Sequence, residues 1–190
     1  MEERKVTISR AKIALDFPAS FMLIASMNPC PCGYFNHPEK ECTCPPGGVQ
    51  KYLNKISGPL LDRIDLHVEV TPVDFNELQS DKTYEKSDSI RARVIKAREI
   101  QAERYKALPG IYANAQISSK TLKEVCIIST AGQNLLRIAM EKLNLSARAY
   151  DRILKVSRTI ADLSRSADIK PEHLAEAIQY RSLDREGWGA

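Results

Sequence analysis

Residues 145–163 read LSARAYDRILKVSRTIADL, and this stretch decides the fold of the C-terminal part of the chain. Its apolar side chains recur at steps of three and four residues, so they fall along one face of an α-helix. That face is formed by Ala149, Ile153, Val156, Ile160, Leu163 and Ala167. Ser146 can cap the helix, because its hydroxyl accepts a backbone N–H of the first turn. The pattern predicts an amphipathic helix over residues 146–166 that packs against other helices.

The segments around this helix are also typical of helices. Ser87 can cap a long helix that ends near residue 108, where Pro109 and Gly110 interrupt the pattern. Pro171 suits the first turn of a final helix that runs to residue 180, because a proline there removes no helical hydrogen bond. Further helices are predicted over residues 49–56, 60–64, 118–126 and 130–143. The second half of the chain is therefore predicted to be entirely helical.

Three segments in the first half are typical of β-strands. Residues 5–9 (KVTIS) and 65–70 (DLHVEV) alternate between polar and apolar side chains. Residues 21–26 (FMLIAS) form a nearly continuous apolar run, which suits a strand buried on both faces of a parallel sheet. A sheet in a globular domain usually holds roughly four to six strands. The first half is therefore expected to be an incomplete piece of a larger α/β domain.

These patterns predict an α/β part, with a partial parallel sheet and helices, followed by an all-α part. The α/β part covers residues 1–86 and includes a cysteine-rich loop at residues 29–48. A long helical insertion at residues 87–110 connects it to a helical domain at residues 111–181, and residues 182–190 form a tail.

The composition is that of an ordinary globular protein. The 190 residues are 43% hydrophobic and 27% charged, and the net charge of +4 is only weak support for a nucleic-acid partner. No apolar run reaches the roughly 20 residues of a membrane span. The first ten residues lack the apolar core of a secretory signal. We therefore expect a cytoplasmic protein with no membrane partner.

Four of the five cysteines gather in one short loop, as two C-x-C pairs separated by nine residues. The pairs are Cys30 with Cys32 and Cys42 with Cys44. Four thiolates at this spacing can close a tetrahedral Zn²⁺ site, and metal binding would order a loop that has few core-forming residues. Free reduced thiols are the alternative. His37 lies in the loop and could replace one cysteine as a ligand, but with four cysteines present it is expected to be a bystander. Cys126 lies on an apolar helix face and is expected in the core.

Three separated segments, in the same order, resemble Mg-chelatase-related AAA+ ATPases of the ComM/YifB type. Residues 17–35 (FPASFMLIASMNPCPCGYF) resemble the sensor-1 region of that family. Residues 57–70 (SGPLLDRIDLHVEV) resemble its arginine-finger segment, and residues 145–163 resemble its sensor-2 helix. The resemblance extends over essentially the whole chain. It implies the C-terminal part of a AAA+ core, followed by a helical lid domain.

The same resemblance implies an ATPase that uses ATP and Mg²⁺. The chain contains no GxxxxGK[ST] motif, and no acidic strand-end motif precedes Asn28. We therefore expect the Walker A and Walker B motifs to lie upstream of Met1, in a longer parent protein. This chain alone is expected to be inactive.

The resemblance assigns roles to three residues. Asn28 would be sensor 1, whose amide can contact a γ-phosphate and the attacking water; its alternative role is to cap the turn before Pro29. Arg63 would be the arginine finger that reaches ATP in a neighbouring subunit, which implies a ring, expected to be a hexamer. The alternative for Arg63 is a surface ion pair with Asp62 or Asp65. Arg148 would be the nucleotide-binding sensor 2, against the alternative of a solvated arginine.

Three functions remain open on these grounds. The first is a motor that remodels DNA, as in branch migration during recombination or transformation. The second is a chelatase-type motor that inserts a metal into a tetrapyrrole. The third is a zinc-organised interaction module without enzymatic activity. The basic residues near residues 6–13, which are Lys5, Arg10 and Lys12, are the candidate DNA contacts, whereas the mixed charge of residues 87–108 favours a solvated spacer.

Overall fold

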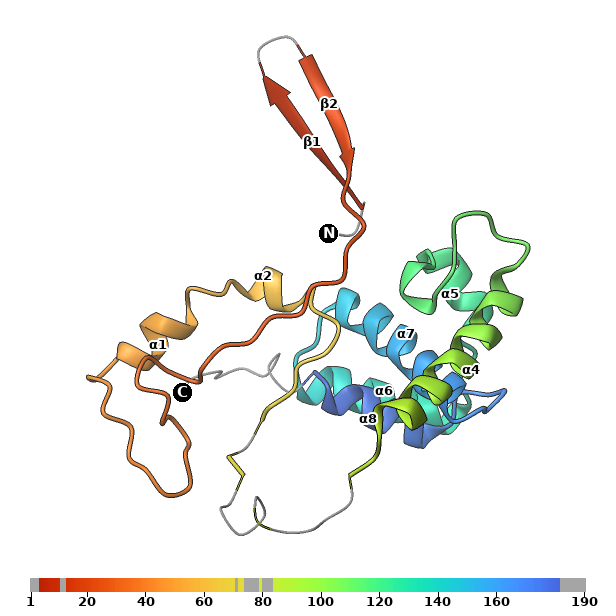
Figure 1. Ribbon diagram of the computed structural model, residues 1–190. Helices are drawn as coiled ribbons and strands as arrows, with labels where there is room; N and C mark the ends of the chain where they lie inside the picture. The colour runs from red at the N-terminus through yellow and green to blue at the C-terminus, as the bar shows by residue number, and fades with distance from the viewer. Residues whose placement is uncertain (1–3, 11–12, 71, 74–78, 80–83, 182–190) are drawn as a thin grey trace. The chain divides into compact units, whose positions relative to one another are not determined.

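The computed structural model describes residues 4–10, 13–70, 72–73, 79 and 84–181. It forms two compact units that divide between Lys55 and Ile56. The first unit holds a β-hairpin, the cysteine-rich loop and helix α1 (Gly48–Leu53), and the second holds the remaining helices (Figure 1). The described chain is thus mixed α/β and mostly helical.

The hairpin consists of β1 (Lys5–Arg10) and β2 (Ile13–Pro18), which pair antiparallel and confirm the strand predicted at residues 5–9. Residues directly opposite each other share a face, so the register separates the side chains by polarity. One face carries Val6, Ile8, Ile13, Leu15 and Phe17, which are 47–65% exposed. On the other face Asp16 accepts hydrogen bonds from Lys5 at 2.8 Å and Thr7 at 2.5 Å. The hairpin is therefore amphipathic.

Two of the strand predictions are wrong. Residues 21–26 and 65–70 are irregular, and the β1–β2 hairpin is the only sheet among the described ranges, so these contain no partial parallel sheet. Met22 and Ile24 are 83% and 82% exposed. A strand requires a neighbour to accept and donate its backbone hydrogen bonds. The apolar run at residues 21–26 indicates a tendency to be buried, but it does not supply the strand that would bury it.

The helix predictions are confirmed, with ends shifted by a few residues. The second unit contains α2 (Gly58–Leu61), α4 (Ser87–Tyr105), the short η1 (Asn114–Gln116), α5 (Ser119–Val125), α6 (Thr130–Lys142), α7 (Ala147–Leu163) and α8 (Pro171–Gln179). Ser146 is the N-cap of α7, where its Oγ accepts the Ala149 N–H at 3.1 Å. Ser87 is instead the first residue of α4, after Lys86 as N-cap. None of the helices described is long and apolar enough to cross a bilayer.

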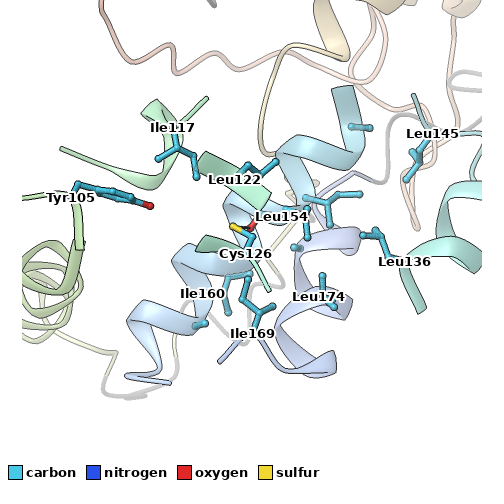
Figure 2. Packing of buried hydrophobic residues seen from close by; sticks show 14 residues of the cluster. Tyr105, Ile117, Leu122, Cys126, Leu136, Leu145, Leu154, Ile160, Ile169 and Leu174 are labelled. Carbon is cyan, nitrogen blue, oxygen red and sulfur yellow. Dashed lines mark hydrogen bonds between the residues drawn. The ribbon is translucent and has the colours of Figure 1, made fainter. Parts of the chain in front are cut away.

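The core of the second unit lies around α7, which packs against α4, α5, α8 and η1, while α6 packs against α8. Ala149, Ile153 and Ile160 of the predicted apolar face are buried there. Figure 2 shows this cluster, in which the Cys126 side chain lies among Leu122, Leu154 and Ile160. The prediction that Cys126 belongs to the core is confirmed.

Helix α4 joins this core only through its C-terminal half. Its buried residues are Ala97, Gln101 and Tyr105, which recur every four residues and therefore form one stripe. The helical residues before Ala97 are all exposed. The solvated spacer predicted for residues 87–108 therefore describes only the N-terminal half of α4, because the C-terminal half packs into the helical core.

A buried ionic network connects α4, η1 and α7. The fully buried Asp162 accepts two hydrogen bonds from Arg104, at 2.7 and 2.5 Å, one from Asn114 at 2.8 Å and one from Arg158 at 3.1 Å. Burial by itself would raise the pKa of Asp162, but the hydrogen bonds from Arg104 and Asn114 outweigh it and hold the pKa below its usual value. The carboxylate is therefore charged and fully paired.

Replacing Asp162 with alanine should destabilise the chain by about 3–5 kcal/mol, because Arg104 and Arg158 would lose the carboxylate that compensates their charge. Urea unfolding of the 190-residue chain measures this change. The exposed Asp168, changed to alanine, is the matched control and should shift the free energy of unfolding by only about 0.5 kcal/mol. Equal effects of the two substitutions would contradict the prediction. Since folding lowers the pKa of Asp162, this stabilisation is present above the usual Asp pKa and is lost as the pH falls through the lowered value.

Candidate functional site

The four predicted cysteine ligands converge in the loop between the hairpin and α1. The Cys30 sulfur lies 3.2 Å from that of Cys32 and 3.8 Å from that of Cys42, and Cys32 and Cys42 are 3.5 Å apart. Together with Cys44, all four sulfurs lie within 4.8 Å of one another. Four sulfurs bound tetrahedrally to Zn²⁺ at about 2.3 Å would be roughly 3.8 Å apart. The donor set and its spacing therefore fit a zinc ion.

The backbone of the first C-x-C pair shapes this cluster. Gly33 takes a left-handed conformation (φ 84°), and its N–H donates to the Cys30 carbonyl at 3.0 Å, which closes a tight turn. The turn directs the Phe35 N–H to the Cys30 sulfur at 3.3 Å. The backbone N–H of Tyr34 similarly lowers the pKa of the Cys32 thiol to about 5. These donors favour the thiolates that a metal requires.

Four neighbouring cysteines cannot all lose their protons easily, because the negative charges of the resulting thiolates would repel one another. The backbone N–H of Cys32 lowers the pKa of Cys44, but desolvation and the adjacent thiols outweigh it and raise the pKa to about 12. A divalent cation removes this conflict, because it favours the deprotonated form of every ligand at once. Soft thiolate ligands in a compact tetrahedral set are typical of zinc and of iron–sulfur centres.

His37 does not belong to the four-sulfur group found among the described residues. Its Nδ1 accepts the backbone N–H groups of Glu39 and Lys40, at 3.1 and 3.2 Å. Its ring packs edge-on against Tyr34, with 5.7 Å between the ring centroids. His37 therefore organises the tip of the loop, as expected for a bystander to the metal ligands.

Asn28 lies in the irregular segment that leads into the cysteine cluster. The residue is exposed, two positions before the buried Cys30. The strand predicted before it is absent from the described structure, so no sheet edge orients its amide here. Its role as sensor 1 stays a prediction.

Arg63 follows the short helix α2 and is partly buried. Its Nη1 donates to the Pro59 carbonyl at 2.7 Å, one turn earlier in the chain. The two aspartates beside it contact arginines of α7 instead. Asp62 lies 3.6 Å from the Arg148 guanidinium, and Asp65 pairs with Arg152.

Asp62 connects the Arg63 segment to the beginning of α7. Its Oδ1 accepts the Ser146 hydroxyl at 2.6 Å, and the same hydroxyl oxygen caps α7. Arg148 stands in the first turn of that helix, with its side chain 52% exposed and its Nη1 near Asp62 Oδ2. The structure therefore brings the segment of Arg63 together with the helix that carries Arg148.

Sequence reasoning missed the partners that hold these segments together. It considered Asp62 and Asp65 only as alternative partners for Arg63. The alternation of acid and base in the DRID tetrapeptide was the available signal, but it does not indicate which arginine each acid contacts. Arg181, whose side chain is only 1% exposed, contacts the same segment and carried no local signal.

Comparison with known proteins identifies the class. Residues 84–181 match the family described as magnesium chelatase, subunit ChlI C-terminal, and residues 1–78 match the family described as magnesium chelatase, subunit ChlI. The chain therefore belongs to the magnesium chelatase family.

Within that family, the chain is of the ComM/YifB type. It is 42% identical over 186 residues to the competence protein ComM of Haemophilus influenzae and 37% identical over 187 residues to the uncharacterized protein YifB of Escherichia coli. Each alignment covers 97% of this chain and 35% of the relative. The chain thus spans about a third of the length of these curated relatives.

Proposed function

We propose that this chain is part of a ring-forming AAA+ ATPase that couples ATP hydrolysis to the remodelling of DNA, as in branch migration during recombination or transformation. The observation that carries the proposal is the 42% identity to a competence protein along almost the whole chain. Experiments on this function require a protein of the length of these relatives that contains the chain, called here the family-length protein.

The proposed chemistry is positioning and charge stabilisation around a transferring phosphoryl group. ATP and Mg²⁺ would be held by the part of the family-length protein outside this chain. Asn28 would contact the γ-phosphate and the attacking water. Arg63 would offset the negative charge that spreads over the phosphoryl oxygens in the transition state. Arg148 would contact phosphate and transmit the nucleotide state to the helical domain, which would then act as a lid.

The ring follows from the role given to Arg63. An arginine finger stabilises ATP bound to the neighbouring subunit, so the active site is complete only between subunits. Contacts of this kind are heterologous, and they close when the rotation between subunits divides a full turn. We take the ring to be a hexamer.

The zinc ion would have a structural role in the first unit. In the loop at residues 29–48, Cys30 is the one residue that is buried. Its order would therefore come from the metal, whose binding free energy becomes folding free energy. A zinc-organised interaction module without enzymatic activity is the alternative that this cluster supports.

DNA binding by the family-length protein should depend steeply on salt. A protein that neutralises several phosphates loses on the order of 10³-fold in affinity between 50 and 200 mM salt, because bound counterions are released. Branched DNA should also stimulate ATP hydrolysis more than a linear duplex of the same length does.

Binding titrations at stepped salt concentrations, with the linear duplex as control, measure these effects. A protein that hydrolyses ATP but neither binds DNA nor responds to it would contradict the DNA proposal. That result would favour the second candidate, a motor for metal insertion, which the name of the matched family supports.

A further inference from the structure

We propose that Arg181 is a positioning residue for Arg63. Arg181 holds the backbone on both sides of Arg63. The proposal rests on the proposed function, because it assumes that Arg63 acts on ATP. Arg181 follows helix α8, 118 positions after Arg63 in the sequence.

The contacts of Arg181 bracket Arg63. Its Nη1 donates to the carbonyl of Ile64, the residue after Arg63. Its Nη2 donates to the carbonyl of Asp62, the residue before Arg63, at 3.5 Å. The same Nη2 lies 3.7 Å from the Asp62 carboxylate. One guanidinium therefore contacts the main chain on either side of the proposed finger.

Because Arg181 is buried, losing its contacts with the Asp62–Ile64 backbone would be energetically costly. The Arg181 side chain is 1% exposed, and a guanidinium buried to that extent is costly unless its N–H groups are satisfied. A planar fork can reach two carbonyls at once, which the single ammonium of lysine cannot do in the same way. A further backbone bond, from the His67 N–H to the Tyr180 carbonyl at 2.8 Å, holds the same two segments together.

This arrangement suits a side chain that must move while its backbone stays fixed. The Arg63 guanidinium now donates to the Pro59 carbonyl, so it must release that bond to reach another subunit. Misplacement of a catalytic group by about 1 Å can cost on the order of 10² in rate. Arg181 would keep the backbone of Arg63 in place while the Arg63 side chain moves.

Substitution of Arg181 with methionine in the family-length protein should lower the rate of ATP turnover on the order of 10²-fold, with KM for ATP nearly unchanged. Arg181→Lys should restore little of it. A double variant with Arg63→Ala should be no slower than Arg63→Ala alone, because both changes remove the same interaction. Arg137→Ala, at an exposed arginine of α6, is the control and should turn over ATP normally.

Mixed rings separate positioning from a merely structural role. A subunit with Asn28→Ala is defective in its own ATP site but still supplies a finger, whereas a subunit with Arg181→Met has the reverse defect. Equal mixing should restore activity at about one interface in four, since subunits are placed at random around the ring. A mixture of Arg63→Ala with Arg181→Met should be no faster than the unmixed variants, because neither subunit supplies a properly placed finger.

The outcomes distinguish the two proposals. If Arg63→Ala turns over ATP normally, the finger itself is wrong and the proposed function fails with it. If Arg63→Ala is slow but Arg181→Met is normal, or if the mixture with Asn28→Ala is not rescued, only the positioning role is overturned.

Discussion

Replacing Arg63 with alanine should lower the rate of ATP hydrolysis by the family-length protein by about three orders of magnitude. The guanidinium would stabilise charge that develops only in the transition state, so its loss affects turnover and leaves ATP binding almost unchanged. In the described structure Arg63 stands at the end of α2 and donates to a carbonyl of its own segment, from which it can be released.

Steady-state kinetics on isolated rings measure this effect. Arg137→Ala is a matched control for the loss of one arginine. Arg137 is exposed and pairs with Glu141 on the same helix. Size-exclusion chromatography of both variants shows whether the ring persists. An intact Arg63→Ala ring that hydrolyses ATP as fast as the control would contradict the assignment.

Loss of one sulfur ligand should abolish metal retention. The 190-residue chain purified in reducing buffer is expected to hold about one zinc ion, and Cys30→Ser should hold almost none after dialysis against a chelator. Structural zinc in small sites contributes roughly 10–16 kcal/mol of apparent binding free energy, most of which requires the complete ligand set. Elemental analysis measures the metal content.

Cys126→Ser provides the matched control, because that thiol is buried in the helical core and bonds to the Leu154 carbonyl. It should retain zinc at the level of the unchanged chain. Hydrogen exchange gives a second readout, since removal of zinc should speed exchange in the loop at residues 29–48 while α7 stays protected. Zinc content that is equal in the two serine variants would exclude the four-cysteine site.

Helices were predictable from the sequence because their pattern is local. The three- and four-residue steps of α7 and its Ser146 cap lie within one stretch of chain, and no distant partner is needed to recognise them. The run at residues 21–26 shows the opposite case. A strand exists only with its neighbour, and the pattern alone does not reveal whether one is present.

The candidate site also has a part that could be predicted from the sequence and a part that could not. The cysteine ligands follow from their spacing, because short C-x-C pairs confine four sulfurs to one loop. The bond between Ser146 and Asp62 spans 84 positions, and that between Arg181 and Ile64 spans 117. Polar contacts at such separations leave no periodic signal. Asp162 is a related case, since a charged residue on the buried face of a helix looks like an interruption of the pattern.

The pairing of Arg104 with Asp162 gives helix α4 the properties of a lever. Its last turns are fixed to α7, while its first ten residues extend free of the core. Nineteen residues at about 1.5 Å each make an arm of roughly 28 Å. A tilt of α7 by about 10° would therefore sweep the far end of α4 through about 5 Å, so a small rotation at one end of the helix becomes a displacement of about one helical turn at the other.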